Sequence, residues 1–163
     1  AMNDAGLKIP MYTYYAGVTG TPTALASGGE SEVYVVAYGH PNLGAPVSTL
    51  QADFKKRFND DYYTYATYNG INLLAGAMAK ARSTNPVQVA KAMEGLQVKS
   101  FAGDVTMRAS DHQLQQPMFI TKWQKAKPGE YKVENTDFTF VPIKQMDPYV
   151  SSTPTSCQMK RPG

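Results

Sequence analysis

The segment from Tyr65 to Gln116 constrains the fold of this chain more than any other part of the sequence. Between Tyr65 and Arg82, apolar residues recur at the spacing of an α-helix, which stops before an Asn-Pro pair. The residues that we expect on one face of this helix are Tyr68, Ile71, Leu74, Ala75 and Met78. From Gln97 onward the period becomes that of short strands on either side of Gly103. The segment therefore predicts two helices followed by a hairpin.

The second of these helices carries clear signals at its start. Asn85 is a favourable N-cap residue, Pro86 suits the first turn, and Gln88 stands where it completes a capping box. The helix is expected to turn its apolar face inward, with Val89, Ala92, Met93 and Leu96. A start marked this well fixes the beginning of the helix at residue 86.

An earlier helix has a similar signature. Gln51 follows Ser48 by three residues, which again predicts a capping box. Apolar residues then recur at helical spacing as far as about Asn59, namely Leu50, Phe54 and Phe58. The basic run Lys55-Lys56-Arg57 lies within this helix, and we interpret it as a solvated face rather than a phosphate-binding patch.

Strand signals lie on both sides of these helices. Lys8–Tyr15 is rich in aromatic residues, and Val33–Tyr38 is a near-continuous β-branched run of the kind buried on both faces of a sheet. A second hairpin is predicted from Met118–Gln124 and Tyr131–Glu134, joined by a turn at Pro128-Gly129. Because strands alternate with helices in the first hundred residues, we predict an α/β fold with a largely parallel sheet.

Size and composition are those of a globular domain that binds neither nucleic acid nor lipid. The 163 residues include 42% hydrophobic and 18% charged residues, and the net charge of +3 is spread along the chain. There is no apolar run long enough to span a bilayer. The opening residues 1–6 resemble a helix end with a glycine cap, so we expect the chain to begin in mid-protein. The lack of a signal peptide then says nothing about compartment.

No group of residues predicts catalysis, a metal site or a cofactor. Cys157 is the one cysteine and has no histidine near it in sequence. Asp111-His112 are neighbours in a segment that we expect to be extended, where their side chains would point apart. Gly17-x-x-Gly20 lacks the lysine of a phosphate-binding loop, and we expect a flexible turn there. We therefore predict that the protein is not an enzyme.

Several short motifs occur in an order that resembles a known family. They are Gly6–Pro10 entering a strand, the Tyr-led helix at Tyr65, Phe101-x-Gly103, Arg108-x-x-Asp111-His112-Gln113 and the closing Cys157–Pro162. This order is similar to the C-terminal half of the periplasmic substrate-binding proteins of branched-chain amino acid ABC transporters. The resemblance implies a type I periplasmic-binding-protein clamshell, in which two Rossmann-like lobes are joined by hinge crossings. The chain would then be an incomplete portion of both lobes.

The resemblance also implies an assignment of residues to lobes. Residues 1–38 would complete the C-terminal lobe, and residues 39–46 would form a hinge crossing that includes His40 and Pro41. Residues 47–124 would belong to the N-terminal lobe, and residues 125–163 would be the return crossing and the C-terminal tail. The missing N-terminal half of the same protein would be the partner that completes both lobes.

In such proteins the ligand lies in the cleft between the lobes. The resemblance implies ligand contacts from the loop after the Lys8–Tyr15 strand and from a tyrosine pair further on, namely Tyr14, Tyr15, Ala16, Gly17, Tyr62 and Tyr63. In amino acid binders a carboxylate holds the ammonium group of the ligand, and by spacing from Pro10 that position is Tyr15 here. A neutral phenol cannot replace that charge, which favours an aromatic or other organic carboxylate over a small hydrophobic amino acid.

The implied function is that of a periplasmic receptor that delivers a small-molecule ligand to the membrane permease of an ABC importer. A sensory or regulatory ligand-binding domain of the same fold is the alternative, because fold alone does not determine function.

Overall fold

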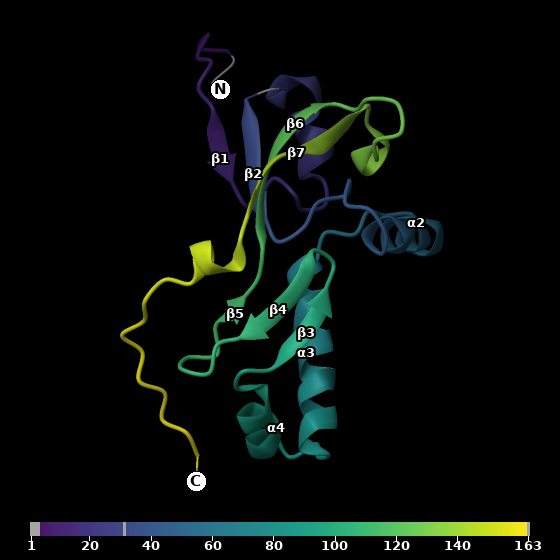
Figure 1. The fold of residues 1–163 in the computed structure, drawn as a ribbon. Helices are drawn as coiled ribbons and strands as arrows, with labels where there is room; N and C mark the ends of the chain where they lie inside the picture. Colours follow the sequence, from purple (N-terminus) through teal and green to yellow (C-terminus); the bar gives the residue numbers. More distant parts are fainter. Residues whose placement is uncertain (1–3, 31, 163) are drawn as a thin grey trace. The chain divides into compact units, whose positions relative to one another are not determined.

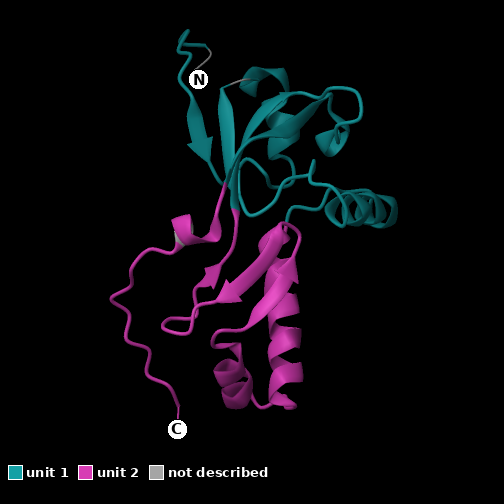
Figure 2. Cartoon of the chain, in the orientation of Figure 1, with its two compact units in different colours: residues 1–63, 118–145 teal, residues 64–117, 146–163 magenta. Residues whose placement is uncertain are grey.

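The computed structural model describes residues 4–30 and 32–162, and these residues form two compact units (Figures 1 and 2). The first unit contains the residues up to Tyr63 together with Met118–Gln145. The second unit contains Thr64–Pro117 and the residues from Met146 onward. The chain thus leaves the first unit after Tyr63 and returns to it at Met118. How these units correspond to the expected lobes stays a prediction.

The first unit is built on a mixed four-stranded sheet. Its strands, in spatial order, are β1 (Met11–Thr13), β2 (Val33–Ala37), β6 (Met118–Lys125) and β7 (Phe138–Met146). β1 and β2 are parallel, with Met11 beside Val33, whereas β6 runs antiparallel to β2. The expectation of a largely parallel sheet is therefore wrong. Parallel neighbours need a crossover such as α1 (Thr21–Leu25) and the 3₁₀ turn η1 (Ala26–Gly29), and the chain supplies it only between β1 and β2.

The core of the first unit surrounds Trp123, which is fully buried. Its indole N–H donates to the carbonyl of Ala26 over 2.8 Å, so the polar end of the ring is satisfied as well. The other buried members of this core are Ala16, Val33, Val35, Val133 and Phe140, with Leu25, Ala37, Tyr63, Tyr131 and Phe138 packed against them. Of the predicted second hairpin, the first strand is confirmed as β6, but the strand that lies beside it is β7 (Phe138–Met146) and not Tyr131–Glu134. Tyr131 and Val133 precede β7 and enter the core through the 3₁₀ turn η2 (Val133–Asn135).

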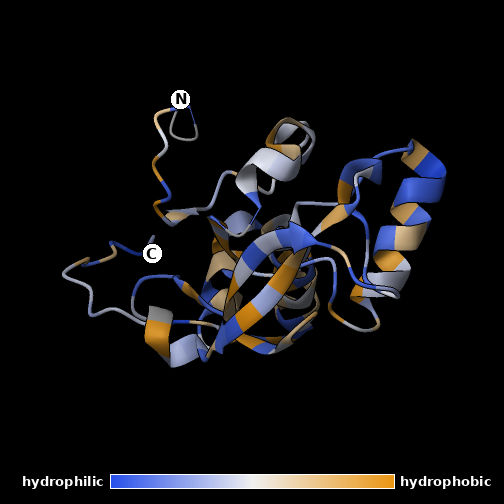
Figure 3. Cartoon of the chain, turned by 90° about the horizontal axis from the view of Figure 1, so that it is seen from above, coloured by the Kyte–Doolittle hydropathy of each residue, from blue (hydrophilic) through white to orange (hydrophobic). Residues whose placement is uncertain are grey.

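Helix α2 (Val47–Phe58) belongs to the first unit and is largely hydrophilic, as the helix at the right of Figure 3 shows. The predicted capping box at Ser48 is wrong, because the helix begins at Val47 and its N-cap is Pro46. Gln51 instead turns inward and is buried. Its side-chain amide donates to the carbonyl of Tyr62 over 2.9 Å and accepts from the N–H of Tyr62 over 3.1 Å. The glutamine therefore holds the chain after the helix.

The second unit contains α3 (Tyr65–Ala81), α4 (Pro86–Met93) and a sheet in the order β3 (Gln97–Ser100), β4 (Gly103–Met107) and β5 (Leu114–Gln115). Both strand pairs are antiparallel, and the predicted hairpin around Gly103 is confirmed. Gly103 has a φ of 114°, which favours glycine at this position. Helix α3 packs against α4 and β3, as Figure 1 shows.

The bounds of α3 agree with the prediction, but the predicted face is only partly the packed one, with Tyr68 and Met78 half-buried. The buried residues are Tyr65, Asn69, Leu73 and Ala77, whereas Ile71 is 63% and Leu74 is 41% exposed. The helix is apolar on several sides, so spacing alone does not select a face. The selected face contains Asn69, whose side-chain amide donates to Gln116 over 2.8 Å and accepts from the Ser100 hydroxyl over 2.5 Å.

Asn85 caps α4 as predicted. Its side-chain oxygen accepts from the N–H groups of Val87 and Gln88, over 3.1 and 3.2 Å. The reciprocal half of the capping box is wrong, because the N–H of Asn85 donates to Ser83 Oγ over 3.0 Å instead of to Gln88. The predicted inward face is confirmed, with Val89 and Ala92 buried against Ala77 of α3, and Met93 and Leu96 packed beside them.

The tail after the 3₁₀ turn η3 (Pro148–Ser151) lies along the second unit, as expected of a surface segment. Arg161 donates to Glu94 and to the carbonyl of Ala109, both over 2.5 Å. Arg108 donates to the carbonyl of Thr153 over 2.8 Å. None of the helices in residues 4–30 and 32–162 is long and apolar enough to cross a membrane.

The buried face of α3 predicts unequal losses of stability for two neighbouring leucines. Leu73→Ala removes a buried side chain and should lower the free energy of unfolding by about 2–5 kcal/mol. Leu74→Ala removes a partly exposed one and should cost less than about 1 kcal/mol. Urea unfolding of the chain, followed by far-UV circular dichroism, measures both. Equal losses would contradict this assignment of the face.

Candidate functional site

The candidate site lies at the edge of the first unit where β1 and β2 end. Because these strands are parallel and Thr13 is in register with Val35, the segments that follow them leave the sheet at the same edge. One is the β1 loop, Tyr14–Gly20, and the other begins at Tyr38 and continues through His40. In open α/β sheets, ligands bind outside the carboxyl ends of parallel strands. The edge therefore brings together two of the segments that the sequence analysis singled out.

Tyr14 and Tyr15 present their rings to solvent at this edge. They are 69% and 66% exposed, and their ring centroids are 4.4 Å apart. The N–H of Tyr15 donates to Thr13 Oγ1 over 3.0 Å, which fixes the backbone at the end of the strand. Exposed tyrosine pairs supply flat apolar area together with hydroxyl groups that can donate to an anion.

Ala16 and Gly17 follow the tyrosine pair in the β1 loop. Ala16 is buried in the core of the first unit, so its methyl group anchors the loop. A Cβ atom on Gly17 would lie 3.8 Å from a methyl group of Val35, which is ordinary contact. Ala16 therefore anchors the loop, and the rings of Tyr14 and Tyr15 before it are exposed.

Tyr62 and Tyr63 follow α2 and differ in their surroundings. The Tyr62 ring packs edge-on against Phe54, with centroids 5.3 Å apart. Tyr63 packs against the core that contains Ala16, and its hydroxyl donates to Glu134 Oε1 over 3.0 Å. Burial and then the negative charges of Glu134 and Asp61 raise the pKa of the Tyr63 hydroxyl, which remains a donor at neutral pH.

Glu134 is the central acceptor of this region and was missed by sequence reasoning. Its Oε1 accepts from the N–H of Gly20 over 2.6 Å, and its Oε2 accepts from the N–H and hydroxyl of Thr23 over 2.8 and 2.5 Å. Burial opposes the charged form, but the hydrogen bonds from Thr23 and Gly20 outweigh it and lower the pKa of Glu134. No local pattern could reveal a partner 114 positions away in sequence.

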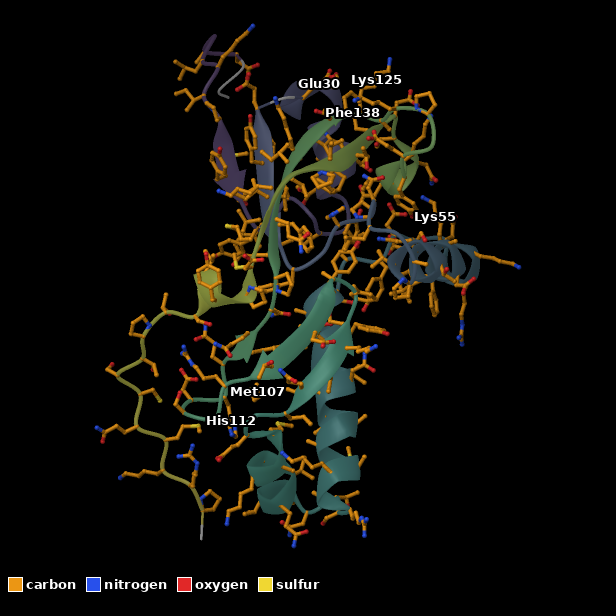
Figure 4. All side chains as sticks on the ribbon, in the orientation of Figure 1. Glu30, Lys55, Met107, His112, Lys125 and Phe138 are labelled. Atoms are coloured by element: carbon orange, nitrogen blue, oxygen red, sulfur yellow. The ribbon has the colours of Figure 1, made fainter. Side chains whose placement is uncertain are left out.

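Asp61 holds the segment that carries Glu134. Its buried carboxylate accepts from Lys55 Nζ over 2.8 Å, from the Tyr131 hydroxyl over 2.7 Å and from the N–H of Glu134 over 2.5 Å. Figure 4 labels Lys55, which reaches it from α2. A buried carboxylate with three donors, one of them charged, is satisfied and rigid.

An open polar hollow of about 230 Å³ lies beside this network. Its lining residues are Thr19, Gly20, Thr23, Lys55, Asn59, Asp60, Asp61, Glu134 and Asn135. The carboxylates of Asp61 and Glu134 already accept hydrogen bonds from the protein. Within residues 4–30 and 32–162, no group of three or more histidine, cysteine or acidic side chains is arranged to hold a metal ion.

His40 and Pro41, the predicted hinge residues, are both buried. The His40 ring meets Phe119 edge-on, with centroids 4.9 Å apart, and its Nδ1 is buried without a hydrogen-bond partner. Burial lowers the pKa of His40 from 6.5 to about 4. The residue is therefore neutral at pH 7 and serves packing at this edge. Its part in a hinge stays a prediction.

The Asp111-His112 pair belongs to a turn of the second unit and is not extended as expected, because His112 has a φ of 56°. Asp111 pairs with Arg108, whose side chain also donates to Gln113. The Arg108 hydrogen bond is the main reason that the pKa of Asp111 falls to about 2. Figure 4 labels His112, whose Nε2 lies 3.6 Å from Glu94. Arg108, Asp111 and Gln113 therefore hold this turn together.

The network around Glu134 predicts a loss of stability in acid. Its lowered pKa means that the stabilisation is complete above the ordinary glutamate value of 4.5 and is lost as pH falls through the folded-state pKa. Glu134→Gln should therefore be less stable than the wild type at pH 7 and should lose less stability between pH 7 and pH 3. Urea unfolding at both pH values measures this, and Glu130→Gln, in the same connection, is the matched control.

The lowered pKa of His40 predicts a second loss of stability, which begins at a higher pH than that of Glu134. The unfolded chain binds a proton near pH 6.5 and the folded chain only near pH 4, so stability should fall as pH drops between these values. His40→Asn should flatten this part of the stability profile, whereas His112→Asn serves as the comparison with the second histidine. Chemical unfolding in steps from pH 7 to pH 4 gives both profiles. A profile unchanged by His40→Asn would exclude the proposed linkage.

The comparisons with known proteins agree with this architecture. The periplasmic binding protein family matches residues 1–128. The Leu/Ile/Val-binding protein homolog 4 of Brucella abortus is 27% identical over 172 residues, which cover 100% of this chain and 41% of that protein. The chain thus spans about two fifths of the length of this relative.

Two solved structures show the same fold. The leucine-, isoleucine-, valine-, threonine- and alanine-binding protein from Brucella ovis, in a closed conformation, matches 99% of this chain and 43% of its own, with a TM-score of 0.86 and 27% identity. The solute-binding protein of an ABC transporter from Rhodopseudomonas palustris BisB5, in complex with 3,4-dihydroxybenzoic acid, matches 90% of this chain and 47% of its own, with a TM-score of 0.64 and 16% identity. The chain has part of the fold of the type I periplasmic binding proteins and belongs to the periplasmic binding protein family.

Proposed function

We propose that this chain is part of an extracytoplasmic solute-binding receptor of an ABC importer, and that its ligand is a small carboxylate with an apolar or aromatic body. The observation that carries the proposal is the exposed Tyr14–Tyr15 pair at the carboxyl edge of two parallel strands. Ala16 below the pair is fixed in the core, so the rings stand on a rigid support. A rigid aromatic surface is suited to reversible binding of a small molecule.

Two ligand classes are compatible with this surface. The relatives at 27% identity are described as binding proteins, or homologues of binding proteins, for leucine, isoleucine and valine, which supports a small hydrophobic amino acid. The second class is an aromatic or other organic carboxylate. The solved complex with 3,4-dihydroxybenzoic acid supports only the capacity of the fold for such a ligand, because its identity to this chain is 16%.

The side chains at the edge favour the aromatic acid. An ammonium group needs an anionic or carbonyl partner, and Tyr15 stands where the resemblance puts an acid. The nearby carboxylates of Glu134 and Asp61 are held by three or more donors each and are not available to a ligand without breaking those bonds. Tyrosine hydroxyls donate to a carboxylate and the rings stack on an aromatic body. We therefore propose an aromatic carboxylate, with a hydrophobic amino acid as the alternative.

The remaining parts of the proposal concern the whole protein. We propose that residues 39–46, with His40 and Pro41, act as a hinge crossing between two lobes, and that the rest of the same protein completes both lobes. Tyr62 and Tyr63 are proposed to contribute to the cleft as well. The partner is the membrane permease of the importer, the location is the periplasm, and the activity is binding without chemical conversion.

Thermal shift of the full-length protein tests the ligand class. A bound ligand stabilises the folded form, so 4-hydroxybenzoate should raise Tm by several degrees, whereas L-leucine and L-valine should not. Replacing both Tyr14 and Tyr15 with alanine should reduce the shift, because the rings supply the contact surface. Tyr149→Ala is the matched control, since Tyr149 is an exposed tyrosine of the second unit.

A shift with leucine and none with 4-hydroxybenzoate would overturn the aromatic-acid proposal and favour the amino acid. The absence of a shift with either ligand class, in a folded full-length protein, would count against the solute-binding function itself.

A further inference from the structure

The β1 loop, Tyr14–Gly20, is tied to the rest of the first unit at its two ends. At the start, the methyl group of Ala16 is buried in the core. At the end, Gly20 has a φ of 87° and is the N-cap residue of α1, where it has no side chain to accept from the first turn. The orphan N–H groups of a helix start need acceptors from elsewhere.

Glu134 supplies those acceptors from a different part of the chain. It accepts from the N–H of Gly20, from both donors of Thr23 and from the hydroxyl of Tyr63. The four donors come from the loop end, the first turn of α1 and the segment after α2. One carboxylate therefore joins the end of the β1 loop to the first turn of α1 and to the segment that carries Tyr63.

The backbone at Glu134 adopts a conformation that is unfavourable for a residue other than glycine. Glu134 has a φ of 50° and Asn135 a φ of 57°, both in the left-handed region. Such conformations persist in non-glycine residues where the surroundings fix them, and they cluster at functional positions. Here the N–H of Glu134 donates to Asp61 Oδ2 over 2.5 Å, while the side chain is held by its four donors. The residue is thus fixed from both sides.

We propose that Glu134 is the positioning residue of the β1 loop, and that it sets ligand affinity by holding Tyr14 and Tyr15 in their binding arrangement. The inference rests on the solute-binding function proposed above and deepens it. Glu134 acts through the loop and needs no contact with the ligand. Its carboxylate already accepts hydrogen bonds from protein donors, which is consistent with an effect on the ligand through the loop and not by direct contact.

The test uses the full-length protein with Glu134→Gln. The glutamine amide nitrogen is a donor, so it cannot accept from two of the four groups that the carboxylate serves. We expect the Kd for 4-hydroxybenzoate, or for L-leucine if that is the ligand that binds, to rise about tenfold in isothermal titration calorimetry. Glu130→Gln is the matched control, because it removes the same charge from the same β6–β7 connection. Its carboxylate accepts locally from the N–H of Lys127 over 2.8 Å.

Two further variants separate positioning from a general loss of stability. Thr23→Val removes the hydroxyl that donates to Glu134 and should weaken ligand binding. Thr23→Ser keeps the hydroxyl and should retain most of the wild-type affinity. Titrations are made well below the Tm of each variant. If Thr23→Ser and Thr23→Val bind equally, or if Glu134→Gln binds as tightly as Glu130→Gln, the proposal is overturned.

Amide hydrogen exchange of Gly20 and Thr23 gives a readout that requires no ligand. Both N–H groups donate to Glu134, so Glu134→Gln should accelerate their exchange at least tenfold relative to Glu130→Gln. If the wild type binds neither probe, the solute-binding function fails, and the exchange rates still decide the role of Glu134. Unchanged exchange of Gly20 and Thr23 would refute the positioning role.

Discussion

The carboxylates of Asp61 and Glu134 form the constraint on which the first unit depends. Asp61 is buried and accepts hydrogen bonds from Lys55, Tyr131 and the N–H of Glu134. The Glu134 carboxylate in turn accepts from Thr23 in the first turn of α1. A buried charge without partners costs far more than a neutral group, so each donor has to stay in place for the others to be favourable. The network therefore fixes the end of the β1 loop and the first turn of α1, while the buried Ala16 anchors the same loop in the hydrophobic core.

Local features of the fold were predictable from the sequence. The Asn85 cap, the ends of α3, the β2 strand and the hairpin around Gly103 each depend on residues within a few positions. The buried face of α3 was not, because the helix is apolar on several sides and its packing is decided by contacts with α4 and β3. Gln51 shows the same limit, since it does not form the predicted capping box and its side chain instead hydrogen-bonds the backbone of Tyr62.

In the candidate site, too, the residues marked by local sequence were predictable and those held by distant contacts were not. An aromatic strand end followed by a glycine-containing loop indicated Tyr14 and Tyr15, and the structure leaves both rings exposed at the carboxyl edge of two parallel strands. Glu134 could not be found this way, because the residues that donate to its side chain lie 71 to 114 positions earlier and its own surroundings in sequence look like a polar turn. Long-range hydrogen bonds to backbone N–H groups leave no periodic trace in a sequence.

Trp123 gives the molecule a built-in spectroscopic probe. It is the single tryptophan of the 163 residues, and it lies fully buried in the first unit with Phe138 and Phe140 beside its ring. Intrinsic tryptophan fluorescence therefore reports on one unit alone, whereas circular dichroism in the amide region reads α3 and α4 of the other unit as well. Superimposable transitions from the two signals would mean that the units unfold as one cooperative block, and separated transitions would give each unit its own stability.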